Sequence, residues 1–126
     1  MKQAFGSTWK SSVQPRKQRK YRIHAPLHIR ASFMHVHLAA PLRLKYKKRA
    51  LLLRKGDKVK IVRGKFAGIE AKVERVDHKL ERVFVDKAEV QKKDGSKAKV
   101  PIHPSKLILT ELYLDDKKRM QKLKPT

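Results

Sequence analysis

The first acidic residue of this 126-residue chain is Asp57. Residues 1–56 hold fifteen Lys and Arg residues and no Asp or Glu, whereas the following seventy residues hold nineteen basic and eleven acidic residues. A segment that carries charge of only one sign repels itself unless an anion neutralises it. We therefore expect the first 56 residues to order against a polyanion rather than form a globule alone, and a nucleic acid suits that role best.

Composition limits the rest of the chain to one small domain with extensions. A hydrophobic fraction of 40% is too high for a wholly disordered polymer. The chain has no cysteine, so disulfides and thiolate metal sites are excluded. We expect no membrane span, since the sequence has no run of 18 apolar residues. We expect no secretory signal either, since the N-terminus has no apolar stretch of about 7–15 residues and no clear cleavage site. A pI near 10.7 indicates a nucleic-acid partner and, as a weaker alternative, an anionic membrane surface.

Residues 1–24 are polar and basic and contain small and turn-forming residues between Gly6 and Pro15. This composition predicts an arm without regular structure, in which Trp9 and Tyr21 lie among the basic residues. A solvated tail is the alternative for the free chain, but the absence of acids favours an arm that binds its partner.

Two prolines mark possible helix starts, because proline suits the first helical turn. After Pro41, the apolar residues Leu42, Tyr46 and Ala50 recur at helical spacing among basic residues. This pattern predicts a short helix with a thin apolar stripe and a basic face. Pro26 marks the other position where a helix could start. A lipid surface also suits a basic helix, but this apolar face is narrow.

From Asp57 the hydrophobic period changes to two, which predicts five short strands and a small twisted barrel. Turn residues separate the strands at Arg63-Gly64, Ala67-Gly68, Asp77-His78 and Asp94-Gly95-Ser96. The alternation slips between Val73 and Val76, as at a β-bulge. The interior candidates are Val59, Ile61, Val73, Val76, Val83, Val85, Val100, Ile102 and Leu107. The acids at 115 and 116 and the bases that follow predict a C-terminal helix over about 115–123.

No catalytic constellation is recognisable, so we expect neither an enzyme nor a cofactor. Acids alternate with bases along the predicted strands, a pattern typical of cross-strand ion pairs rather than of a catalytic carboxylate pair. His35 and His37 would point the same way on a strand, but nothing nearby offers further ligands for zinc. We therefore expect no metal site, and a contact to RNA or simple packing suits these histidines better.

A glycine-centred loop over residues 63–68 is the most informative local pattern. Its glycines permit backbone conformations that other residues avoid, and Arg63, Lys65 and Phe66 would lie at the tip. Two cations and an aromatic ring suit a contact to phosphate and base. The alternative is an ordinary hairpin with Phe66 folded back, and the pattern alone does not choose between them.

This glycine-centred segment, residues 55–73, resembles the KOW motif of certain ribosomal proteins and transcription elongation factors. Several stretches around it resemble one ribosomal family: the basic run 15–20, the Ala-Pro-Leu-His stretch 25–28, the Leu-Ala-Ala-Pro-Leu stretch 38–42, Asp94-Gly95, and residues 101–107 with the His-Pro-Ser-Lys element 103–106. That family is the large-subunit ribosomal protein numbered twenty-four in bacteria and twenty-six in eukaryotes, and the long arm resembles its archaeal and eukaryotic members. Ala71 departs from the family, which usually has glycine there, and we expect a strand position where small size matters.

The resemblance implies a mainly β fold, an SH3-like KOW barrel over 51–112, with a basic extension over 1–50 that contains short helices and a short C-terminal helix or tail over 113–126. It also implies a structural, non-enzymatic translation protein in the cytoplasmic ribosome. Such a protein would bind the 5′ region of large-subunit rRNA, act early in assembly and lie near the polypeptide exit tunnel. Its partners would be rRNA, neighbouring ribosomal proteins and, at the tunnel exit, targeting factors or the translocon, with no small-molecule substrate.

The expected RNA-binding residues lie in the arm, in the basic helix, in the glycine-centred loop over residues 63–68, which we call the KOW loop, and in the later loops. They are Lys10, Arg16, Lys17, Arg19, Lys20, Tyr21, Arg22, His28, Arg30, Lys47, Lys48, Arg49, Arg63, Lys65, Phe66, Gly68, Lys97, Lys99, His103, Ser105 and Lys106.

Two other binding functions are compatible with the sequence. A KOW-type transcription or RNA-processing factor would share the barrel, although no companion domain is recognisable. A DNA-compacting chromosomal protein would share the charge.

Overall fold

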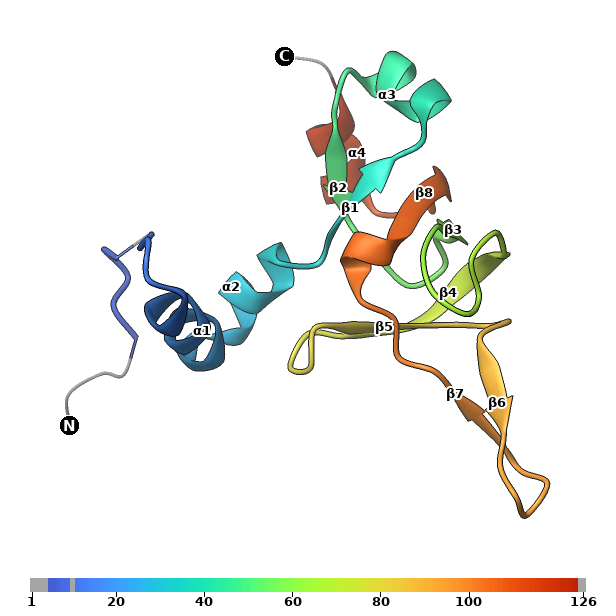
Figure 1. The fold of residues 1–126 in the computed structure, drawn as a ribbon. Helices are drawn as coiled ribbons and strands as arrows, with labels where there is room; N and C mark the ends of the chain where they lie inside the picture. Colours follow the sequence, from blue (N-terminus) through green and yellow to red (C-terminus); the bar gives the residue numbers. More distant parts are fainter. Residues whose placement is uncertain (1–4, 10, 125–126) are drawn as a thin grey trace.

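A computed structural model describes residues 5–9 and 11–124 of the chain, and strands dominate its architecture (Figure 1). The helices are α1 (Pro15–His24), α2 (Leu27–Ser32), α3 (Ala40–Tyr46) and α4 (Lys117–Leu123), with a 3₁₀ turn η1 at Pro104–Lys106. The strands are β1 (His35–Leu38), β2 (Ala50–Leu52), β3 (Lys58–Ile61), β4 (Glu70–Asp77), β5 (Arg82–Val85), β6 (Glu89–Gln91), β7 (Lys97–Lys99) and β8 (Leu107–Glu111). This confirms the expected mainly β, barrel-like fold with helices at both ends.

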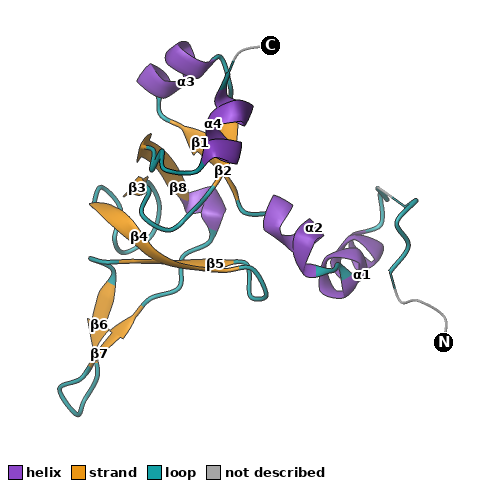
Figure 2. Cartoon of the chain, turned by 180° about the vertical axis from the view of Figure 1, so that it is seen from behind, coloured by secondary structure: helices purple, strands orange, loops and turns teal. Residues whose placement is uncertain are grey.

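Six strands form one mixed sheet in the order β2-β1-β8-β3-β4-β5. All neighbours are antiparallel except β1 and β8, which run parallel. The remaining strands, β6 and β7, form a separate hairpin that projects from the sheet, while α1 and α2 extend to another side (Figures 1 and 2). The expected bulge is present, because the β4–β5 register shifts between Val73 and Arg75.

Strand β1 and the first residue of β2 belong to the sheet, although the expected extension covered residues 1–50. In β1, Val36 and Leu38 are buried while the two histidines between and before them are exposed, so the segment has an ordinary one-sided strand pattern. Ala50, which the sequence placed on the stripe of a helix, instead begins β2. The helix ends earlier because Lys47 adopts a left-handed conformation with φ of 52°.

The N-terminal arm is partly helical, so the expectation of an irregular segment over 1–24 was wrong for residues 15–24. The turn-forming residues end at Pro15, and Pro15 itself lies in the first turn of α1, as Pro41 does in α3. Gln14 accepts the first amide hydrogen bonds, from Lys17 and Gln18. The expected helix starts after Pro26 and at Pro41 are confirmed.

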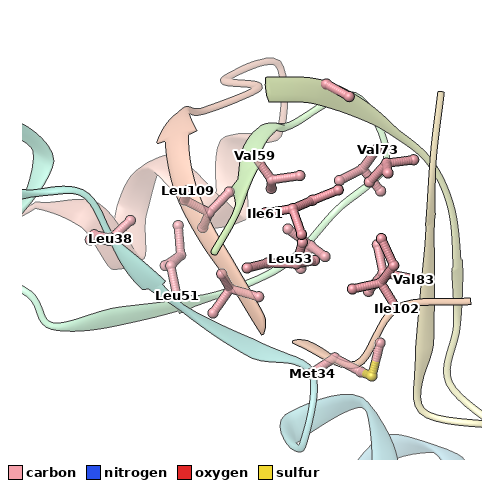
Figure 3. Packing of buried hydrophobic residues seen from close by; sticks show 14 of the residues in the cluster. Met34, Leu38, Leu51, Leu53, Val59, Ile61, Val73, Val83, Ile102 and Leu109 are labelled. Carbon is pink, nitrogen blue, oxygen red and sulfur yellow. The ribbon is translucent and has the colours of Figure 1, made fainter. Parts of the chain in front are cut away.

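The hydrophobic core lies between the strands of the large sheet (Figure 3). Of the interior candidates, Val76 and Val100 are only half-buried and the other seven are buried. Segments outside the predicted barrel also contribute, because Met34, Val36, Leu38 and Leu123 belong to the same cluster. At about 1.5–3 kcal/mol for each large buried side chain, these additions matter to a small domain.

The C-terminal helix is fixed to the sheet by a buried ion pair. The guanidinium of Arg119, 4% exposed, donates to both carboxylate oxygens of Asp57, which is fully buried, at 2.6 and 2.7 Å. The same guanidinium donates to the carbonyls of Tyr113 and Leu52, and Asp57 also accepts from the amides of Arg54 and Tyr113. The expected C-terminal helix is confirmed, and Asp116 caps its start by accepting from the Lys118 amide at 3.0 Å.

Gly56 and Ala71 are small residues with separate steric roles. Gly56 has φ of +92°, and a Cβ there would lie 3.2 Å from the Tyr113 ring. Ala71 is 4% exposed in β4 opposite Val59, and it is not among the residues with positive φ. The expectation that position 71 is an ordinary strand position is therefore confirmed.

Candidate nucleic-acid interface

The loop that joins β3 to β4 has the tight backbone that its glycines predict. Gly64 and Gly68 have φ of +100° and +89°, a region that residues with a Cβ rarely adopt. The base of the loop is closed by two hydrogen bonds, from the Gly68 amide to the Ile61 carbonyl at 2.7 Å and from the Ile61 amide to the Ile69 carbonyl at 3.0 Å. Nothing lies within 4 Å of where a Cβ would stand on either glycine, so this backbone faces open space.

The aromatic residue of this loop packs inward. Phe66 is half-buried against the hydrophobic core, and the Lys65 ammonium lies 5.9 Å from the centre of its ring. The folded-back alternative thus describes Phe66 in this structure. The side chains of Arg63 and Lys65 are exposed, so the loop offers two cations and an open glycine backbone to a ligand.

The His-Pro-Ser-Lys element lies against the KOW loop, although 42 residues separate Arg63 from Ser105. The Arg63 guanidinium donates to the Ser105 carbonyl at 3.1 Å and to its hydroxyl at 3.3 Å. The Ser105 amide in turn donates to Nδ1 of His103 at 3.2 Å, and the Val62 amide donates to the Lys106 carbonyl at 2.9 Å. The structure therefore joins two separately predicted loops into one surface, which we call the two-loop surface (residues 62–69 and 103–106).

Charges from other elements surround His103. Partial burial and then the charges of Arg82 and Arg22 hold the pKa of the His103 imidazole below its usual value, while Glu81 acts in the opposite direction and Lys106 in the same one. The environment therefore favours the neutral imidazole, which accepts the Ser105 amide hydrogen bond. Arg82 was not among the predicted site residues, since its place at the start of β5 identifies a strand rather than a contact.

The arm is connected to the same region by its last helical turn. Arg22 forms an ion pair with Glu81, which lies in the β4–β5 turn with φ of 54°. Arg30 on α2 donates to the carbonyls of Ala25, Ile23 and Lys79, so its guanidinium holds the arm against that turn. The predicted cations of α1 are exposed, as is His28 on α2, whereas Lys10 lies outside the described residues. These exposed α1 cations are Arg16, Lys17, Arg19, Lys20 and Arg22.

Aromatic rings pack around Tyr21 on α1. The ring centre of Tyr21 lies 5.0 Å from those of Phe5 and Trp9 and 6.3 Å from that of Phe33. Arg22 places its guanidinium 5.5 Å from the Phe33 ring centre. The sequence identified Trp9 and Tyr21 as aromatic residues among cations, but not the contribution of Phe5 and Phe33.

The basic residues after α3 lie in its connection to β2, the strand at one edge of the large sheet. Lys47 and Arg49 are exposed, and the half-buried Lys48 donates to the Lys122 carbonyl on α4. This contact ties the α3–β2 connection to the C-terminal helix, so Lys48 has a structural partner in addition to its predicted role.

The predicted cations of β7 are compensated by acids. Lys99 is paired with Glu74 and lies 3.9 Å from Glu89, and Lys97 lies 3.8 Å from Glu89. The expected cross-strand pairing of acids with bases is confirmed here. The β6–β7 hairpin therefore carries less uncompensated positive charge than α1, which contains no Asp or Glu.

The two strand histidines lie on the exposed face of β1. His35 places Nδ1 against the Ser32 carbonyl, which gives it a local structural role. Within residues 5–9 and 11–124, no three His or acidic side chains converge as metal ligands, and no helix has the length and apolarity to cross a membrane.

Comparison with known proteins identifies the family. A family model that describes the eukaryotic ribosomal proteins L26 and their archaeal equivalents, numbered twenty-four, matches residues 12–125. The chain is 57% identical over 112 residues to the large ribosomal subunit protein uL24 of Methanosphaera stadtmanae, a match that covers 89% of this chain and 96% of that protein. Proteins of the same name from Methanothrix thermoacetophila and Methanospirillum hungatei are 49% and 46% identical, over 93% of each relative's length and 86% and 89% of this chain. This protein belongs to the ribosomal protein family that comprises eukaryotic L26 and its archaeal equivalent, numbered twenty-four.

Proposed function

We propose that this protein is a structural, non-enzymatic component of the large ribosomal subunit and binds the 5′ region of large-subunit rRNA directly. In this proposal it joins the subunit early in assembly, in the cytoplasm, and lies near the polypeptide exit tunnel. Neighbouring ribosomal proteins would contact it there, and targeting factors or the translocon would approach it at the tunnel exit. Family membership supports the ribosomal assignment, since the relatives are large-subunit proteins by name.

The observation that carries the RNA-binding proposal is the junction of the two-loop surface with the arm. Arg63 binds Ser105, His103 lies among the charges of Arg22 and Arg82, and Arg22 belongs to the acid-free α1. Cations from three separate parts of the chain thus lie close to His103 and Ser105.

The chemistry of this surface suits a phosphate backbone more than base edges. Exposed Lys and Arg side chains and an open glycine backbone contact phosphate, which positions a protein without reading sequence. Structured RNA is selected largely by shape and by contacts to phosphate and ribose. The proposed interface would therefore recognise the fold of the rRNA and neutralise it at several points.

The salt dependence of binding tests this proposal. The variant R16Q/K17Q/R19Q/K20Q keeps the full chain and removes four α1 charges; each phosphate contact that is lost should flatten the slope of log affinity against log salt by about 0.7–0.9. The control K92Q/K93Q/K117Q/K118Q removes four exposed lysines outside the proposed interface. Filter binding to a 5′-domain rRNA fragment should show a weaker, flatter dependence for the first variant only. Equal slopes for the two variants would contradict the arm's role.

Sedimentation tests the ribosomal assignment separately. A tagged full-length copy should migrate stoichiometrically with large subunits through a sucrose gradient at high salt. Migration with RNA polymerase, DNA or the light fractions would overturn the proposal and favour one of the other binding functions.

A further inference from the structure

The aromatic residues of the arm surround a hollow that the contacts described so far leave unfilled. Its volume is about 270 Å³, and Phe5, Gly6, Trp9, Lys17, Lys20 and Tyr21 line it. Pockets for drug-sized ligands begin at about 300 Å³, so this hollow suits one small planar group.

The lining combines flat apolar walls with positive charge. Phe5 and Trp9 are inclined to the Tyr21 ring by 38° and 44°, and all three rings are half-buried, so part of each ring remains accessible. Lys17, Lys20 and Tyr21 stand three and four residues apart, which places them on one face of α1. A ligand in this hollow would meet aromatic faces and two ammonium groups together.

The geometry points to a stacking site for a single unpaired nucleobase of RNA, with Lys17 and Lys20 binding the adjoining phosphates. Every nucleobase has a π face, and stacking on aromatic side chains is how proteins commonly hold single-stranded nucleotides. The charge complements this occupant, because residues 1–56 contain no acid that would repel a phosphate. The inference rests on the proposed rRNA-binding function and assigns to the arm one base-dependent contact within a surface that otherwise binds phosphate.

The cluster also contributes to the structure of the arm. α1 has no fully buried residue, and its tie to the rest of the protein is through Tyr21, Arg22 and the contacts of Arg30. A purely structural aromatic cluster would hold α1 in place and would not bind nucleobases. The experiment must therefore separate base stacking from helix docking.

Trp9 is the only tryptophan of the chain and reports directly on this site. Two probes of equal length and charge are used with the full chain: a short oligoadenylate and an abasic ribose-phosphate oligomer. Oligoadenylate should quench Trp9 fluorescence saturably, and the abasic oligomer should leave it nearly unchanged. Equal quenching by both probes, or quenching by anionic lipid vesicles without quenching by oligoadenylate, would overturn the inference.

Matched variants separate the two kinds of contact. Trp9→Leu keeps an apolar contact for Tyr21 but removes the ring; it should weaken oligoadenylate binding by about 5- to 150-fold and leave the abasic oligomer unaffected. Trp9→Phe should restore most of the affinity. Lys17→Gln should weaken both probes to the same extent. Labelled-probe anisotropy measures affinity, and circular dichroism confirms that α1 remains helical in each variant.

The outcomes distinguish this inference from the proposed function. Unchanged oligoadenylate affinity in Trp9→Leu, together with co-sedimentation of the wild-type protein with large subunits, would remove the stacking site and retain the ribosomal assignment. Base-dependent quenching in a protein that does not sediment with ribosomes would retain the stacking site and remove the rRNA assignment.

Discussion

Arg119→Met should destabilise the protein by about 3–5 kcal/mol, although it changes one residue in a basic helix. Methionine keeps an unbranched apolar stem like that of arginine but has no guanidinium to pair with the fully buried Asp57. The carboxylate would keep only two donors, the amides of Arg54 and Tyr113. Removing one partner of a buried ion pair costs about 3–5 kcal/mol because the other charge remains desolvated. Small domains have a total stability of about 5–15 kcal/mol, so this is a large fraction.

The double variant D57L/R119M tests the same reasoning. It removes both charges, but the Arg54 and Tyr113 amides then lose their acceptor. Each buried donor left unsatisfied costs about 1–3 kcal/mol. The double variant should therefore recover only part of the stability lost by Arg119→Met. In this respect it would differ from buried ion pairs that can be replaced jointly by apolar residues without loss of stability.

Urea unfolding of the full chain, followed by far-UV circular dichroism, measures these differences. Arg54→Met is the matched control because it breaks another Arg–Asp pair, with Asp116 at 2.9 Å, whose side chains are 49% and 23% exposed. Exposed pairs contribute about 0–1 kcal/mol. If Arg119→Met costs no more than Arg54→Met, the buried pair does not hold α4 as described.

Three further predictions concern backbone conformation and pH. Gly56→Ala should destabilise the protein more than Gly64→Ala, since both positions require positive φ but only the first would bring a Cβ within 3.2 Å of a ring; thermal unfolding of the two variants compares them. Ala71→Gly should cost roughly 0.5–1 kcal/mol in urea unfolding, because a buried strand position gains nothing from glycine, and a stabilised variant would contradict that placement. Burial and neighbouring cations lower the pKa of His103, so the unfolded state binds its proton first as the pH falls. Stability should therefore drop below about pH 6.5, and His103→Asn, which keeps an acceptor for the Ser105 amide, should reduce that drop; identical pH profiles would contradict the assignment.

Local patterns predicted the parts of the fold that local interactions determine. The strands around Val59, Val73 and Val83 follow from alternation, and the loops between them follow from Gly and Asp at turn positions. The bulge in β4 was visible as a slip in that alternation. Long-range pairing had no such signal, because nothing in residues 35–38 indicates a parallel partner at 107–111.

The same limit applies to individual side chains. Lys117, Lys118 and Arg119 are consecutive cations, and only the helix geometry turns the third one inward to Asp57. The KOW loop and the His-Pro-Ser-Lys element were recognisable separately, but the Arg63–Ser105 contact depends on how β8 enters the sheet. Predicted RNA contacts at Arg30 and Lys48 also have intramolecular partners that composition does not reveal.

The position of β8 in the sheet has a consequence for the timing of folding. β8 lies between β1 and β3, so the N-terminal and central strands have no direct pairing until residues 107–111 exist. Synthesis at about 5–20 residues per second takes roughly 3–11 s to proceed from residue 56 to residue 111. Throughout that interval the nascent chain presents its acid-free segment without the sheet that later positions it. The protein is therefore a polycation before it is a folded domain, and its exposure to the wrong polyanion is greatest while it is still being made.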